Sequence, residues 1–226
     1  ITDHMPLSDR AGPRQRLWRV RAGEVLLATG AFERPLVFAN NDLPGVILAG
    51  AATSYLHRYG VLVGRDLVVA TNNDSAWHAA VSLAEAGARI AAIIDARPAP
   101  PQTLLAAAEA MNIPVRCGAA PERAMGRKRV RAVEVCRLDA DGRLCGKSER
   151  FACDTLLMSG GWNPAVHLHS QAGGMLRLDP ALQSFLPKAL EGATSLGAAA
   201  GDFSVDNTLA AARGPAADPG NQPVRP

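Results

Sequence analysis

The sequence predicts an α/β protein built around a parallel β-sheet. Two observations support this prediction: short apolar runs typical of buried strands recur along the chain, and segments with helical periodicity separate them. The clearest case is the stretch 67–95, where an apolar run, a polar turn, an amphipathic helix and a second apolar run follow one another. Because helical crossovers connect these strands, the strands are expected to run parallel in one sheet.

The chain that precedes this stretch begins without a periodic pattern and then contains two apolar runs. Residues 1–16 are polar, rich in Arg and Pro, and without periodicity. Apolar runs follow at 17–20 and 24–28, and the second run ends abruptly at Thr29-Gly30. Such an ending is typical of a buried strand that enters a tight turn.

The βαβ unit at 67–95 has well-marked boundaries. A continuous apolar strand at 67–70 leads through a polar turn at 71–74 into a helix at 75–86. A second apolar strand at 89–94 ends at Asp95. The fold class predicted from this unit is a Rossmann-like dinucleotide-binding domain.

Further elements surround this unit in the sequence. The remaining predicted elements are a helix at 50–59 ended by Gly60, a helix at 104–111, strands at 115–117, 130–138, 150–152 and 155–158, and a disordered Pro/Gly-rich tail at 214–226. The strands at 130–138 and 150–152 form a predicted antiparallel β-meander. The domain is therefore expected to combine a parallel sheet with an antiparallel insert.

Composition excludes several classes of protein. The chain has 226 residues, 48% of them hydrophobic and 20% charged, as in soluble globular proteins. Its apolar runs are too short to cross a bilayer, and no secretion signal is visible, so we expect a cytoplasmic protein that does not enter membranes. The one basic cluster, at 123–131, lacks interleaved aromatic residues, so no nucleic-acid partner is expected.

The four cysteines do not form a C-x-x-C motif, which disfavours a redox-active dithiol. Cys136 and Cys145 flank a turn signal at 139–142. A two-residue loop would place them directly opposite each other, whereas a Gly bulge would shift the register by one and separate them. The sequence leaves these alternatives open, with reduced thiols as the default.

The turn of the βαβ unit is the first candidate cofactor site. A glycine-rich turn before a helix N-terminus holds a pyrophosphate through backbone N–H groups. Here Thr71, Asn73 and Ala76 occupy the three positions where glycines are usual, so the turn is altered. The candidate cofactor-binding residues of this unit are Asn72, Asn73, Asp74 and Ser75 in the turn, with Asn73 or Asp74 as N-cap, and Asp95 as a possible acceptor for a ribose hydroxyl.

Small residues mark three further candidate positions. Thr29-Gly30 and Gly160-Gly161 each close an apolar strand, where a backbone can pass close to a ligand. Gly201-Asp202 places an acid next to a glycine near a predicted helix start. That Asp could accept a hydrogen bond from a cofactor hydroxyl or serve as an ordinary N-cap, and the sequence favours neither.

Four stretches together resemble a known family. They are ATGAFERPLVFANNDLPGV (28–46), YLHRYGVLVGRDLVV (55–69), TNNDSAWHAA (71–80) and SGGWNPAVHLHSQ (159–171). These residues resemble the alpha subunit of heterotetrameric sarcosine oxidase, over about 14–213. The resemblance implies an enzyme that oxidatively demethylates sarcosine with the help of other subunits.

The resemblance also implies cofactors. In such an enzyme the alpha subunit holds NAD, FAD is bound in the beta subunit, and FMN lies between the two subunits. The family's glycine-rich fingerprint would precede residue 1 and its folate domain would follow residue 213, so the isolated chain is expected to be inactive. Because Glu33 and Arg34 lie inside the strongest stretch, we favour a role for them near a cofactor over a surface ion pair.

The resemblance suggests a domain order. The predicted parts are 1–45 as the end of a first FAD-type nucleotide-binding half, 46–165 as a central NAD-binding-like domain, 166–213 as the return to the first half, and 214–226 as a tail. The fold is thus a Rossmann-like domain flanked by pieces of a second, incomplete FAD/NAD-binding domain.

Two alternative functions and one weak signal remain. The chain could be an NAD(P)H-dependent flavoprotein reductase, which predicts a C-x-x-C motif, or a degenerate docking module, which the altered turn favours. His167 and His169 alternate and would lie on one face if this segment were a strand, but no third ligand has suitable spacing. We therefore predict no metal site and no catalytic residue.

Overall fold

The computed structural model describes residues 2–4 and 15–213, which fall into two compact units. In this part of the chain, the first unit contains the residues up to Ala31 and from Pro164 onward, and the second unit is Phe32–Asn163. The strands β4 (Ala31–Glu33) and β13 (Trp162–Pro164) pair with each other where the chain passes from one unit to the other. The assignment of the parts to particular nucleotides stays a prediction.

The second unit is built on a five-stranded sheet in which every pairing is parallel. In spatial order its strands are β5 (Val46–Leu48), β12 (Thr155–Ser159), β6 (Asp66–Thr71), β7 (Arg89–Asp95) and β8 (Val115–Cys117). Residues 67–71 are all buried, because layers cover both faces of the sheet. The parallel sheet predicted from the apolar runs is confirmed.

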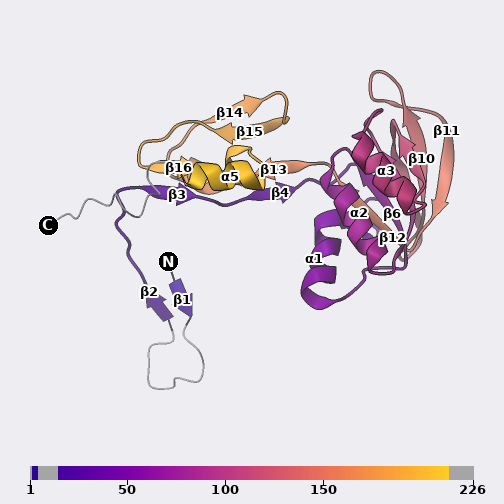
Figure 1. The fold of residues 1–226 in the computed structure, drawn as a ribbon, viewed down its shortest axis with the longest axis horizontal. Coiled ribbons are helices and arrows are strands. Elements are labelled where there is room, and N and C mark those ends of the chain that lie inside the picture. Colours follow the sequence, from indigo (N-terminus) through magenta and orange to yellow (C-terminus); the bar gives the residue numbers. More distant parts are fainter. Residues whose placement is uncertain (1, 5–14, 214–226) are drawn as a thin grey trace. The chain divides into compact units, whose positions relative to one another are not determined.

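Three helices cover one face of this sheet (Figure 1). They are α1 (Ala49–Tyr59), α2 (Ser75–Glu85) and α3 (Gln102–Ala110), close to the predicted helices. Trp77 and Leu83 of α2 are almost completely buried against Leu67 and Ile93 of the sheet. Full burial of one such aliphatic side chain stabilises the fold by about 1.5–3 kcal/mol. As predicted, α1 ends at Gly60, whose φ of 65° is left-handed.

A three-stranded antiparallel sheet covers the opposite face (Figure 1). Its strands are β9 (Ala119–Gly126), β10 (Val130–Leu138) and β11 (Leu144–Ala152). The meander is confirmed, but the sequence did not predict β9 because its residues, APERAMG after Ala119, show no apolar alternation. In β11, extra residues around Gly146 shift the register, so that Cys145 faces Arg137 and not Cys136. Both thiols are free.

The first unit contains short strands and helices. They are β1 (Thr2–His4), β2 (Gln15–Leu17), β3 (Val25–Leu27), α4 (His167–Gln171), β14 (Leu176–Asp179), β15 (Ser184–Pro187), β16 (Ala193–Ser195), the 3₁₀ helix η1 (Gly197–Ala200) and α5 (Val205–Ala212). The strands pair two by two: β1 with β2, β3 with β16, and β14 with β15. Residues 1–16 show no periodicity in the sequence, yet β1 and the start of β2 lie within them.

Many apolar side chains of the first unit are exposed in the described residues. Leu26 is 56% exposed, Phe185 58% and Leu178 57%, whereas few residues such as Leu27 and Leu186 are buried. A two-stranded sheet gives too little apolar contact to be stable by itself. The described part of this unit is thus a thin layer that leaves apolar faces open.

Two further expectations can be judged against this unit. His167 and His169 lie in the helix α4, so the prediction of alternating imidazoles on a strand face was wrong; the turn-forming Gly173-Gly174 after this segment favours a short helix. The predicted disordered tail at 214–226 lies outside the described residues.

Within the described part, no helix combines the length and apolar character needed to cross a bilayer.

Candidate functional site

Polar residues from three neighbouring strands meet at the carboxyl edge of the parallel sheet. The register pairs Ser159 at the end of β12 with Thr71 of β6, and Thr71 with Asp95 of β7. All three side chains are buried. Ligands of open α/β sheets bind outside this edge, so it is the part of the second unit in which to look for a site.

Asn73 organises the turn between β6 and α2. Its Oδ1 atom accepts hydrogen bonds from the backbone N–H of Ser75 at 3.2 Å and from the Ser75 hydroxyl at 2.6 Å. Its Nδ2 atom donates to the backbone oxygen of Ser159 at 3.2 Å and to the Ser159 hydroxyl at 3.0 Å. Trp162 Nε1 donates to the Ser75 hydroxyl at 3.0 Å. Asp74 occupies the N-cap position but makes no side-chain cap hydrogen bond, so Asn73 satisfies the first donor of α2.

The Asp95 carboxylate is completely buried and is surrounded by donors. Trp77 Nε1 donates to its Oδ2 at 2.8 Å. Arg97 donates to it from the backbone N–H at 2.8 Å, from Nε at 3.1 Å and from Nη2 at 2.8 Å. Arg97 also donates from Nη1 to Asp74 at 2.6 Å, and hydrogen bonding to Asp95 raises the pKa of this guanidinium. Both Asp95 oxygens therefore already have partners within the protein.

Glu33 belongs to β4, and its side chain reaches the start of α1. Its Oε2 accepts the backbone N–H of Gly50 at 2.8 Å, and a Cβ on Gly50 would stand only 2.7 Å from this oxygen. Burial raises the pKa of Glu33, while hydrogen bonds from Ser159 and Gly50 act in the opposite direction. The carboxylate thus satisfies a helix N-terminus from inside the protein.

The chain's own backbone fills the space beside Gly160 and Gly161. Gly160 N donates to the Arg34 oxygen at 2.7 Å, and Arg34 N donates to the Gly161 oxygen at 2.8 Å. A Cβ on Gly160 would lie 2.9 Å from the Pro35 oxygen, and Gly161 has a φ of 93°. Asn72 Nδ2 adds a long bond of 3.4 Å to the Gly160 oxygen. The sequence predicted a close backbone approach here, and the approaching group is the segment after β4.

A cavity of about 450 Å³ lies between α1 and α2, and Glu33 and Trp162 also line it. The polar groups that line it are Thr53, Ser54 and His57 from α1, and Ser75, His78 and Ser82 from α2. Each set recurs at helical spacing, so the cavity is a groove between the two helices. Hydroxyl and imidazole groups offer neutral hydrogen bonds to a ligand.

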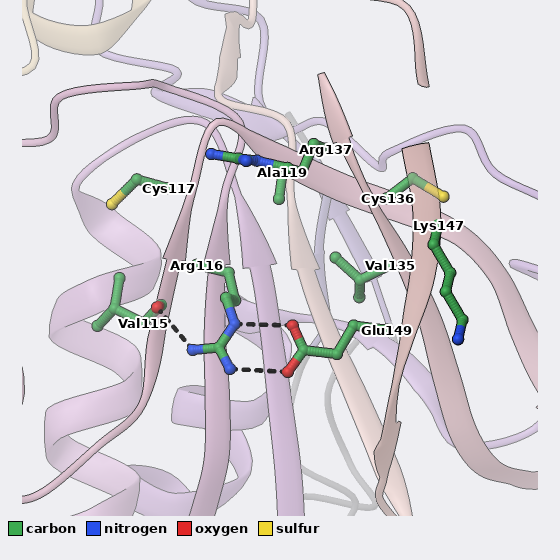
Figure 2. A pocket seen from close by; sticks show the side chains of 9 residues that line it. All are labelled: Val115, Arg116, Cys117, Ala119, Val135, Cys136, Arg137, Lys147 and Glu149. Carbon is green, nitrogen blue, oxygen red and sulfur yellow. Dashed lines mark hydrogen bonds and ion pairs between the residues drawn. The ribbon is translucent and has the colours of Figure 1, made fainter. Parts of the chain in front are cut away.

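A second cavity of about 350 Å³ lies beside β8, β10 and β11 (Figure 2). Arg116 forms a bidentate ion pair with Glu149, at 2.8 and 2.7 Å, and lies over the Phe151 ring. Hydrogen bonding from Arg116 holds the pKa of Glu149 below its usual value. Sequence reasoning missed this pair because it joins β8 of the parallel sheet to β11 of the antiparallel sheet, and no local pattern reveals that contact.

The remaining predicted residues all belong to the first unit. Because β3 and β16 run parallel, the segments that follow them leave the same end of this sheet. Thr29 Oγ1 donates to the Ala165 oxygen at 2.7 Å, and Gly30, at a φ of 76°, has no atom within 4 Å of where a Cβ would be. Asp202 Oδ1 accepts the Ser204 backbone N–H at 2.9 Å just before α5.

The contacts of Gly201 differ from those of Gly30. Gly201 has a φ of 87°, and a Cβ there would stand 2.6 Å from Leu186. Its backbone N–H donates to the Ala198 oxygen at 3.1 Å. A side chain at Gly201 would therefore clash with Leu186, whereas the space beside Gly30 is open.

Neither metal ligands nor activated thiols gather in the described part of the chain. No group of three or more His, Cys, Asp or Glu residues there could hold a metal ion. His169 is buried with Nε2 3.2 Å from the Met175 oxygen. Burial raises the pKa of Cys153 to about 12, so this thiol stays protonated at neutral pH.

Part of this chain is similar in sequence to known proteins. No family model matches the chain. It is 45% identical over 193 residues to the sarcosine oxidase subunit alpha of Corynebacterium sp. (strain P-1), covering 83% of this chain and 19% of that protein. The alpha subunit from Rhizobium meliloti (strain 1021) is 41% identical over 189 residues, covering 83% of this chain and 18% of that protein. The chain is a homologue of part of the sarcosine oxidase alpha subunit.

This chain therefore spans about a fifth of the length of the alpha subunits that it matches. Solved structures with the same fold are more distant. T. acidophilum thioredoxin reductase is 19% identical, with a TM-score of 0.62 over 83% of this chain and 61% of that one. A FAD-dependent pyridine nucleotide-disulphide oxidoreductase from Desulfovibrio vulgaris is 20% identical, with a TM-score of 0.53 over 76% of this chain and 43% of that one. The predicted Rossmann-like fold is thereby confirmed.

Proposed function

We propose that this chain is the nucleotide-binding portion of the alpha subunit of a sarcosine oxidase-like amine oxidoreductase, and that it works only within a multi-subunit complex. The observation that carries the proposal is the 45% identity over 193 residues. This match is longer than the second unit, Phe32–Asn163, and so extends into the first. Shared sequence across both units favours a shared role over a reused fold.

In the first unit, we infer that Thr29, Gly30, Gly201 and Asp202 contribute to a nucleotide. The open space beside Gly30 lets a ligand approach the backbone closely. Ser204 orients the Asp202 carboxylate, which can accept a hydrogen bond from a ribose hydroxyl. A bound flavin or nicotinamide nucleotide would supply the hydride chemistry. NAD is the nucleotide proposed for this subunit, and FAD and FMN are proposed for the complex.

We assign no catalytic residue to the chain itself. The groups that bind and oxidise the amine, which we take to be sarcosine, are proposed to belong to other subunits. The exposed apolar side chains of the first unit, such as Leu26 and Phe185, agree with a part that packs against further polypeptide.

The alternative is a reductase, since the chain shares its fold with thioredoxin reductase. A reductase of this class needs a pair of reactive thiols. All four cysteines of the described chain are free, and none follows another at C-x-x-C spacing. The high pKa of Cys153 makes it a poor nucleophile. The thiol chemistry therefore favours the amine oxidase over the reductase.

A segment exchange tests the proposal. The matching stretch of the Corynebacterium sp. (strain P-1) alpha subunit is replaced by residues 15–213 of this chain, and the chimera is purified with its partner subunits. We expect an assembled complex that retains bound NAD and consumes oxygen when sarcosine is added. A complex that assembles and carries flavin but neither binds NAD nor oxidises sarcosine would contradict the proposal. Size-exclusion chromatography distinguishes that result from failed assembly.

A further inference from the structure

The second unit has the architecture of a dinucleotide-binding domain, but its own side chains occupy the positions that a dinucleotide would use. A pyrophosphate at such a turn is held by backbone N–H groups at the start of the helix. The Ser75 N–H, which is one of these donors, already donates to Asn73 Oδ1 at 3.2 Å. The Asn73 N–H donates to the Thr71 hydroxyl at 3.0 Å.

The Asn73 side chain also fills the space that a glycine would leave open. Its amide is held from both ends, by Ser75 through Oδ1 and by Ser159 through Nδ2. The Ser75 hydroxyl is engaged in addition by Trp162 Nε1. Displacing this amide would break its bonds to Ser75, Ser159 and Asn72, which is costly in a partly buried place.

The acid that would bind a ribose is occupied in the same way. Asp95 is fully buried, and Trp77 and Arg97 together saturate its two oxygens. A ribose hydroxyl could reach it only by displacing one of the bonds from Trp77 or Arg97. The residues at this turn therefore do not fit a dinucleotide.

We infer that Asn73 is a built-in substitute for a phosphate group, which closes the turn and makes the second unit a scaffold rather than a dinucleotide site. The amide oxygen replaces a phosphate oxygen as the acceptor for the α2 N-terminus, and the amide nitrogen ties this helix to the end of β12. This inference goes beyond the proposed function, since it holds for any amine and any partner subunit.

Amide hydrogen exchange tests the inference. In the purified protein, NAD⁺ is added to saturation and deuterium uptake is followed by NMR or mass spectrometry across 71–77. We expect no change in this segment. A ligand at a hundred times its dissociation constant would slow exchange at a true site about a hundredfold, and such protection of Ser75 would overturn the inference. Calorimetry on the same sample reports whether NAD⁺ binds elsewhere, which concerns only the proposed function.

A variant tests the substitute directly. In Asn73→Ala the Ser75 amide loses its acceptor, so we expect its exchange to become at least about tenfold faster, whereas His78→Ala, at an exposed position of the same helix, should leave it unchanged. Unchanged exchange in Asn73→Ala would overturn the inference. Should Asn73→Ala fail to fold, as judged by circular dichroism, the ligand experiment on the unaltered protein decides alone.

Discussion

The buried carboxylate of Asp95 depends on Arg97 for its charge balance, so replacing Arg97 should destabilise the fold. Its charge is balanced by Arg97, whose side chain is 30% exposed while that of Asp95 is 0% exposed. Replacing Arg97 with Met keeps the length of the side chain but removes the charge and the donors. Breaking one side of a buried ion pair costs about 3–5 kcal/mol. Because Arg97 is partly exposed, we expect its replacement to lower the free energy of unfolding by about 3 kcal/mol.

The assay is urea unfolding at pH 7, followed by tryptophan fluorescence, which reports Trp77 next to Asp95. Arg89→Met is the matched control, because its ion pair with Asp66 is exposed at 65% and 45% and should contribute about 0–1 kcal/mol. In an Asp95→Asn background, Arg97→Met should cost clearly less, since the charge to be balanced is gone. Equal losses for Arg97→Met and Arg89→Met would refute the reasoning.

Three further predictions concern single side chains. Asn73→Ala should lower the free energy of unfolding by about 1–3 kcal/mol because it removes hydrogen-bond partners from Ser75 and Ser159, while His78→Ala, at an exposed position of the same helix, should stay within about 0.5 kcal/mol; thermal denaturation checks both. Because the folded-state pKa of Glu33 is raised, the contribution of this residue to stability falls as the pH rises from about 4.5 through that raised pKa. The Glu33→Gln variant should therefore gain stability relative to the unaltered protein between about pH 4 and pH 7. A difference in stability that does not vary with pH would contradict this prediction. With iodoacetamide at pH 8, exposed Cys145 should react while Cys153, with its pKa of about 12, stays unmodified; equal labelling by mass spectrometry would show that burial does not protect it.

Much of the second unit could be predicted from the sequence, because local patterns determine it. The apolar runs that became β6 and β7 are continuous since both faces of the sheet are covered, and α2 shows its buried stripe at helical spacing. The strand β9 was missed, because its Pro121, Glu122 and Arg123 give no strand pattern and its position depends on pairing with β10. Whether Cys136 and Cys145 face each other could not be predicted either, because a bulge sets the register between their strands.

The candidate site was predicted less completely than the fold. The sequence placed Asn73 and Asp95 where a nucleotide would bind, and the structure does bring both to the carboxyl edge of the sheet. The contacts that hold the turn at Asn73 could not be foreseen, since Ser159, which bonds to Asn73, and Trp162, which bonds to Ser75, lie more than eighty residues away in the chain. Only the three-dimensional arrangement reveals that Asn73 bonds to groups within the protein.

The most direct measurement is a crystal structure of the complete alpha subunit with its bound nucleotide. We predict that the nucleotide contacts the segments around Gly30 and Asp202 in the first unit, and that Asn73 keeps its bonds to Ser75 and Ser159. A pyrophosphate bound to the Ser75 N–H, with the Asn73 amide turned away, would contradict the account.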